Sequence, residues 1–258
     1  MRSKRFATGA AAAALALLPL TAVAADDHVG AEIIVVHGVP GLEVDVLVDG
    51  AAAITGFEFG DVVKTTLPAG DYTFGVAATG TTDAILELEA SLGAGLSATI
   101  AAFLDANGDP QLRAFVNENG ATGIQPFHLA NFGAVDILSG TTAVLENVTN
   151  GQTARIDVDG GTTVAAVGIG AAGSGTAAIE LGDVTVAANQ LVLAYAIGPD
   201  TGETLPTVVT ATTNVGGLQA IPSGTGGQVA MLPMALLAVA LFGTFLLVAP
   251  RRTVRDQA

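Results

Sequence analysis

The sequence predicts an all-β fold: two tandem antiparallel β-sandwich domains, immunoglobulin-like or transthyretin-like, followed by one C-terminal transmembrane helix. Three observations predict this. Short apolar or alternating runs, broken by Gly, Asp, Asn and Pro, follow one another from Ile33 to Val215. Motifs of the first half return about 91 residues later. An uncharged run of 21 residues, 229–249, stands just before Arg251-Arg252.

The two ends of the chain predict where it is located. Three basic residues within the first five positions precede an apolar run and Ala22-Val23-Ala24, so residues 1–24 are expected to be a signal peptide. At about 1.5 Å per residue, 229–249 is long enough to cross a hydrocarbon core about 30 Å thick. The basic pair behind it favours a cytoplasmic tail, 250–258. We therefore expect a single-pass protein of the cell membrane with its N-terminal ectodomain outside.

Six runs in the first half have the length and the pattern of strands. Turn-forming residues such as Asp49-Gly50 and Pro68-Ala69-Gly70-Asp71 separate them, because these residues tolerate positive φ or preset a turn. We expect no amphipathic helix in the ectodomain. Short strands with turns every 8–12 residues or so are typical of a β-sandwich. The predicted strands are Ile33–Val36, Val44–Val48, Val62–Leu67, Tyr72–Val76, Ala84–Ala90 and Ser97–Leu104.

The second half repeats the first at a nearly constant spacing. Val36-His37 returns as Phe127-His128, and Val44-Asp45-Val46 returns as Val135-Asp136-Ile137. A period of about 90 residues indicates tandem domains, because solenoid repeats are roughly 20–50 residues long. The polar stretch 119–123 is the expected boundary. The predicted division is a signal peptide 1–24, a first sandwich 30–120, a second sandwich 124–215, a Gly-rich stalk 216–228, a transmembrane helix 229–249 and a tail 250–258.

Three spaced motifs of the first half resemble a known family. They are Ile34-Val35-Val36-His37-Gly38-Val39-Pro40, then Val44-Asp45-Val46-Leu47-Val48-Asp49-Gly50, then Leu67-Pro68-Ala69-Gly70-Asp71-Tyr72-Thr73. In this order they are similar to the motifs of the domain-of-unknown-function family number 4397, although Arg is usual at Ile34 and Tyr at Leu47. The resemblance implies a secreted or surface-anchored bacterial or archaeal protein with two tandem β-sandwich copies, the second degenerate. It implies no activity.

The charge balance limits the possible partners. The chain has 9 Lys+Arg and 24 Asp+Glu, and six of the basic residues and one acidic residue lie in 1–24 and 250–258. The ectodomain therefore holds Lys64, Arg113 and Arg155 against 23 acidic residues, a net charge of −20. Such a surface repels nucleic acid, so no nucleic-acid partner is expected. The absence of cysteine excludes disulfides and thiolate metal sites.

Asp105, Asn107 and Asp109 are the candidate metal ligands. They alternate in Asp105-Ala106-Asn107-Gly108-Asp109, with Gly at the turn, as oxygen ligands do in a calcium loop. The twelfth position of an EF-hand loop would be Val116, where a bidentate Glu is needed. A tight β-hairpin explains the same residues. We expect no cofactor, and calcium is the one alternative that the sequence offers.

His37 and His128 each stand eight residues before an Asp, Asp45 and Asp136. Either each His and Asp form a small metal or proton site, or each imidazole binds a loop backbone and fixes a turn. The recurrence favours the structural interpretation, because a fold determinant recurs whenever the fold does.

Two catalytic patterns are weak. Gly168–Gly173 matches G-x-G-x-x-G, but Ser174-Gly175-Thr176 and a strand-like run follow it, so we expect a hairpin and no dinucleotide site. No G-x-S-x-G occurs, and Ser97 and Ser139 have no visible catalytic partners. We therefore expect no enzyme, but a membrane-anchored surface protein with a structural, adhesive or partner-binding role. The alternatives are a calcium- or ligand-binding surface module and, third, an extracellular hydrolase.

Overall fold

The computed structural model describes residues 30–199 and 206–216, and this part of the chain is all-β, as predicted. It contains strands and turns but no helix, so none of its segments could cross a membrane as a helix. The predicted signal peptide, transmembrane helix, tail and all but the first residue of the stalk lie outside the described residues.

The first half of the chain forms two four-stranded sheets. The first inner sheet has the order β4-β1-β7-β8, and the first outer sheet has the order β3-β2-β5-β6. All neighbours are antiparallel except β1 and β7, which run parallel. The strands are β1 (Ala31–His37), β2 (Val44–Val48), β3 (Ala51–Phe57), β4 (Val62–Leu67), β5 (Gly70–Ala78), β6 (Ala84–Leu92), β7 (Ser97–Leu104) and β8 (Pro110–Val116).

The second half forms two sheets with the corresponding strand order. The second inner sheet is β12-β9-β16-β17, with β13 also paired to β9, and the second outer sheet is β11-β10-β14-β15. Its inner sheet again contains one parallel pair, β9 with β16. The strands are β9 (Gly123–Asn131), β10 (Val135–Ser139), β11 (Thr142–Val148), β12 (Gln152–Thr153), β13 (Ile156–Asp157), β14 (Thr162–Ala171), β15 (Ile179–Val186), β16 (Gln190–Pro199) and β17 (Thr207–Asn214).

The parallel pair corrects the prediction of purely antiparallel sheets. Parallel neighbours need a long crossover connection between them. In each half the crossover includes both sheets. After β1 or β9 the chain forms two outer strands, returns to the edge of the inner sheet as β4 or as β12 and β13, forms two more outer strands and then returns as β7 or β16. Local alternation of side chains gives no signal for this arrangement, because it is the same in parallel and antiparallel strands.

Each half has apolar side chains between its inner and outer sheets. In the first half they form one cluster that includes Ile33, Val46, Phe57, Phe74 and Ile100. In the second half they form two smaller clusters, one around Val135 and Ile137 and one around Ile124 and Val186.

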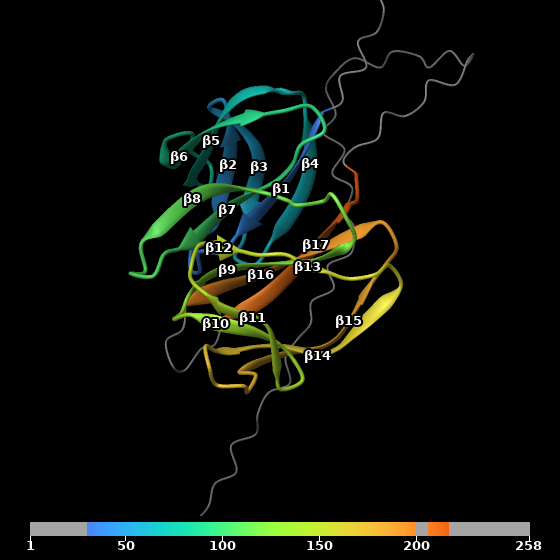
Figure 1. The fold of residues 1–258 in the computed structure, drawn as a ribbon. Coiled ribbons are helices and arrows are strands. Elements are labelled where there is room, and N and C mark those ends of the chain that lie inside the picture. Colours follow the sequence, from blue (N-terminus) through green and yellow to red (C-terminus); the bar gives the residue numbers. More distant parts are fainter. Residues whose placement is uncertain (1–29, 200–205, 217–258) are drawn as a thin grey trace, which may run out of the picture.

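A third apolar layer joins the two inner sheets. Ile34, Val36 and Phe103 from the first half pack with residues of the second half, among them Leu193 and Tyr195, and all five are nearly inaccessible to solvent. The two halves therefore stack as four sheets, outer, inner, inner, outer, as Figure 1 shows. This explains why every residue of β1 is buried: both of its faces are covered.

Candidate functional site: the polar contact between the halves

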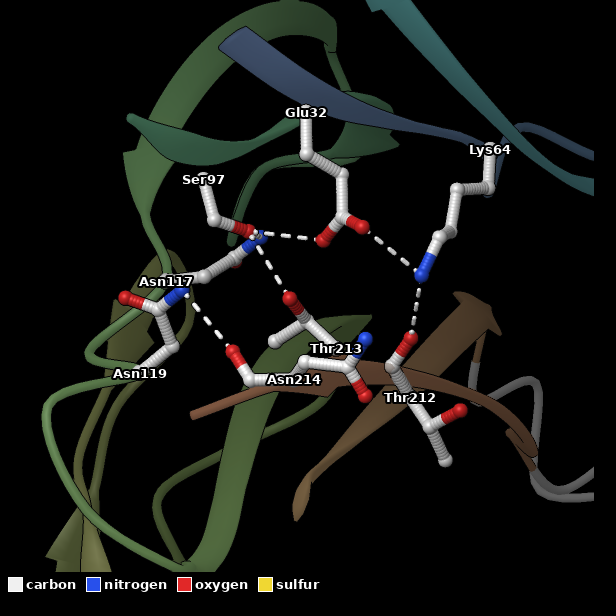
Figure 2. Close-up of polar contacts among 8 residues, drawn as sticks. All are labelled: Glu32, Lys64, Ser97, Asn117, Asn119, Thr212, Thr213 and Asn214. Atoms are coloured by element: carbon white, nitrogen blue, oxygen red, sulfur yellow. Dashed lines mark hydrogen bonds and ion pairs between the residues drawn. The ribbon is translucent and has the colours of Figure 1, made fainter. Parts of the chain in front are cut away.

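A buried carboxylate lies where the two inner sheets meet (Figure 2). Glu32 of β1 is only 5% exposed, and its Oε2 lies 2.7 Å from Nζ of Lys64 on β4. Its Oε1 accepts a hydrogen bond from Oγ of Ser97 at 3.1 Å. Ser97 Oγ also lies 3.4 Å from Oγ1 of Thr213 on β17. A buried charge is tolerated when it is paired and hydrogen-bonded, as it is here.

The network extends through Asn117 to the aromatic core. Asn117 donates from Nδ2 to Ser97 Oγ at 3.0 Å, and its Oδ1 accepts from Oγ1 of Thr99 at 2.8 Å. The hydroxyls of Thr99 and Tyr195 are 2.8 Å apart, so the first half meets the second at the centre of the block. Burial raises the pKa of Tyr195, opposed by its bond to Thr99, so this phenol stays protonated.

All three basic residues of the predicted ectodomain donate to main-chain carbonyls near this contact. Lys64 Nζ donates to Thr212 O at 3.0 Å, and Arg113 Nη1 donates to Gly151 O at 3.3 Å. Arg155, from the second half, donates to Glu118 O in the connection that follows β8. Since these three cations are bonded between or near the halves, the outer surfaces of the described block have an excess of acidic groups.

The two histidines occupy corresponding places and bind loop carbonyls. His37 Nε2 lies 2.8 Å from Leu42 O, and His128 Nε2 lies 3.0 Å from Gly133 O. Both residues are buried, and Nδ1 of each has no hydrogen-bond partner within the part of the chain that the structure describes. These bonds hold the loops after β1 and β9, which is the structural interpretation of the repeated histidine.

Asp45 and Asp136 hold two backbone segments each. Asp45 accepts from the amides of Gly56, at 2.9 Å, and Gly80, at 2.8 Å. Asp136 accepts from Asn147, at 2.8 Å, and Gly173, at 2.7 Å. The backbone bond from Asn147, followed by that from Gly173, lowers the pKa of Asp136. The repeated Asp is thus bonded to the backbone of its own outer sheet.

The first half has Gly56 and the second half has Asn147 as the amide donor to the repeated Asp, and the backbone conformation explains this difference. Gly56 and Asn147 both have positive φ, 64° and 54°. Gly takes this conformation freely, and Asn is among the few other residues that tolerate it.

The candidate calcium residues form the turn between β7 and β8. Asp105 Oδ1 accepts from the amides of Asn107, at 2.8 Å, and Asp109, at 2.9 Å, while Oδ2 accepts from Gln111 Nε2 at 3.1 Å. The bond from the Asp109 amide is the main cause that lowers the pKa of Asp105. Among the described residues, no three His, Cys, Asp or Glu side chains group as metal ligands would.

Calcium should stabilise the protein no more than sodium does at equal ionic strength, because backbone amides and Gln111 already occupy the Asp105 oxygens. Thermal unfolding of the full chain in EDTA, then with a calcium titration, measures this. The control is the double variant Asp105→Ala/Asp109→Ala. A saturable rise of the melting temperature that this variant loses would establish the calcium site instead.

Stability should depend on pH through His128. Burial is the main cause that lowers the pKa of His128 from 6.5, opposed by its bonds to the backbone of Gly133 and Phe132. Below about pH 6.5, His128 is protonated in the unfolded chain but stays neutral in the folded protein. Its contribution is therefore complete above this pH and is lost as the pH falls through the lowered pKa. Urea unfolding between about pH 5 and 7.5 should show this slope, and His128→Gln should lack it.

The two weak catalytic patterns have structural roles. Gly168 and Gly170 lie in β14 and face the turn that leads to β15, where a Cβ on Gly170 would come 2.2 Å from Thr176 O. This segment is a hairpin connection, as expected. Ser97 belongs to the buried network described above, and Ser139 Oγ donates to Ala165 O at 2.9 Å.

The sequence did not predict the buried network. Glu32, Thr99, Asn117 and Thr213 carry no motif, and Tyr195 stands within an apolar run. The only available signal was the scarcity of cations: three basic residues in so acidic an ectodomain are each expected to have a specific partner.

Comparison with known proteins bears on the first half and the first strands of the second. A search of curated proteins finds no match to this chain. A family model matches residues 31–138, from β1 into β10, and this range includes all three motifs that suggested the resemblance. Most of the second copy lies outside this range, so its membership stays a prediction. Residues 31–138 match the model of the family described as Domain of unknown function (DUF4397).

Proposed function

We propose that this chain is a non-catalytic surface module, held on the outside of the cell membrane by residues 229–249 and exported by the signal peptide 1–24. The observation that carries the proposal is the double-sided burial of the inner sheets. The apolar layer around Phe127 and Tyr195 makes one four-layer block of the two sandwiches. A rigid block suits a protein that presents a fixed surface at a distance from the membrane.

The chemistry of the described polar groups supports a role without catalysis. The buried Ser97, Glu32 and Asp45 are engaged in hydrogen bonds that connect strands and sheets. A catalytic group must instead lie within reach of a substrate in a pocket. We assign both halves to the immunoglobulin-like or transthyretin-like sandwiches, whose end loops and strand edges commonly contact partners.

The exposed edge of the first outer sheet supports a contact surface of acidic character. Along β6, the exposed positions include Glu87 and Glu89, which alternate with half-buried apolar residues. Charges on an edge strand discourage unwanted pairing with other sheets. The same charges would favour a basic partner, and the association would then weaken as salt is raised.

Epitope tags test the proposed topology. One tag is inserted after Asp26 and, in a second version, one is added after Ala258. We expect an antibody to reach the first tag on intact cells and the second only after the cells are permeabilised. Deletion of 229–249 should release the protein into the medium. A first tag that is hidden on intact cells, or a deleted chain that stays in the cytoplasm, would contradict the proposal.

A further inference from the structure

The second half contains an apolar cavity between its inner and outer sheets. Its volume is about 280 Å³, and it lies between the two small apolar clusters of this half. Most of its wall is made of aliphatic side chains from both sheets. Among them are Ile137, Val148, Val167, Ile169, Val192 and Ala194.

Comparison with the first half shows why the side chains of the second half leave this space unfilled. Val44 pairs with Phe57, and the corresponding Val135 pairs with Val148. Phe74, opposite Val48, corresponds by register to Val167, opposite Ser139.

The third difference lies on the inner sheets, where Ile100 opposite Val35 corresponds to Ala194 opposite Pro126. Phe57, Phe74 and Ile100 all belong to the single core cluster of the first half. The second half has a smaller side chain at each of these three positions, while its strand order is unchanged.

The cavity has a polar rim at one side of the sandwich. Asp183 and Thr185 of β15 and Thr210 and Thr212 of β17 line it and are exposed to solvent. In the first half the corresponding edges, β6 and β8, lie closer together than β15 and β17 do. An exposed rim provides an entry path from the outside.

The charge at the rim selects among ligands. The lining contains one ionisable group besides His128, the Asp183 carboxylate, which accepts a hydrogen bond from the amide of Ala166 at 2.9 Å. Among the described residues, no Lys or Arg lines the cavity. An anionic ligand such as a fatty acid would meet a negative charge without a compensating cation.

We propose that this cavity binds a neutral, apolar small molecule with on the order of ten carbon atoms. An apolar cavity of about 150 Å³ stays dry and can bind benzene, so one nearly twice as large accommodates a correspondingly larger molecule. Water is a poor occupant, because each buried molecule needs two to four polar partners. The hydroxyls of Thr210 and Thr212 at the rim could accommodate one uncharged polar end of the ligand.

Naphthalene is the probe, and thermal unfolding of the full chain is the first measurement. At about ten times its dissociation constant, naphthalene should raise the melting temperature by about 3–6 °C. Val167→Phe and Ala194→Ile restore the residue types of the first half and fill the cavity. Each should raise the melting temperature without ligand and abolish most of the response to naphthalene. Equal responses in the wild type and in folded filled variants would overturn the proposal.

Methyl NMR locates the ligand even if a filled variant fails to fold. In the full wild-type chain, naphthalene should shift the methyl signals of Ile137, Val148 and Ile169. Ile33 and Val46, which lie between the sheets of the first half, serve as internal controls and should not shift. Absent or uniform shifts would refute the site. The result does not depend on where the protein resides, so it is independent of the surface topology proposed above.

Discussion

Replacing Phe127 by alanine should lower the free energy of unfolding by about 3–5 kcal/mol, as expected for a fully buried phenylalanine. Phe127 is 1% exposed and belongs to the second half. Its ring meets Phe115 of the first half edge-on, with centroids 5.7 Å apart, and Tyr195 at 4.7 Å. The loss is a large part of the 5–15 kcal/mol that stabilises a typical domain.

The more informative consequence is that the halves should unfold together. Phe57 lies only between the sheets of the first half and is also nearly inaccessible, so Phe57→Ala removes the same ring away from the contact. If the inner layer couples the halves, Phe57→Ala should lower the hydrogen-exchange protection of β16 amides as well as that of β1 amides. Unchanged protection of β16 in this variant would show that the halves are independent.

Strands with strong patterns were predicted with the observed bounds. The structure has Val44–Val48, Val62–Leu67 and Ser97–Leu104 as expected. In the first half two strands were not predicted, Ala51–Phe57 and Pro110–Val116. The first begins with three alanines, which show no alternation of polar and apolar side chains. The second begins with a proline, which is tolerated at the first residue of an edge strand but reads as a turn in sequence.

The packing of the two inner sheets could not be predicted from these patterns. Alternation shows which face of a strand is buried, but it does not show which sheet covers that face. The continuous apolar run Ile33–Val36 did contain a hint, because strands covered on both faces lose their alternation. This run alone does not predict burial on both faces, because it is also compatible with a strand that has one covered face. The cavity was equally hidden, since it depends on the volumes of side chains that meet only across sheets.

Among the polar residues, too, the sequence predicts the role of those that recur with the repeat but not of those with distant partners. For His37 and His128 the repeat predicted a structural role, and their bonds to loop carbonyls confirm it. Glu32 is bonded to Ser97, 65 positions away, and Tyr195 to Thr99, 96 positions away, so no local pattern could indicate these bonds. Long-range polar networks of this kind follow from the docking of whole sheets.

Asp45→Ala should also be destabilising, by about 1–3 kcal/mol in the free energy of urea unfolding at neutral pH. The side chain is 4% exposed and accepts from the Gly56 and Gly80 amides. An amide left without an acceptor costs about 1–3 kcal/mol where it is buried. Gly56 is half-buried and Gly80 is exposed, so most of the loss is expected from the Gly56 amide. Asp61→Ala is the matched control, because Asp61 accepts one bond from the Glu58 amide at an exposed site, where water can replace it.

The intermediate variant Asp45→Asn separates geometry from charge. Asparagine keeps the shape and one acceptor oxygen, but its NH₂ group is a donor and would meet one of the two amide donors. We therefore expect a loss between those of wild type and Asp45→Ala. If Asp45→Ala instead unfolded like the Asp61→Ala control, the two amide bonds would not be the reason for this aspartate. If the losses follow the order Asp45→Ala, then Asp45→Asn, then wild type, Asp45 of the Val-Asp-Val motif stabilises the outer sheet through its two amide bonds. A chain without this aspartate should then lose function because it unfolds, and not because it lacks a binding or catalytic group.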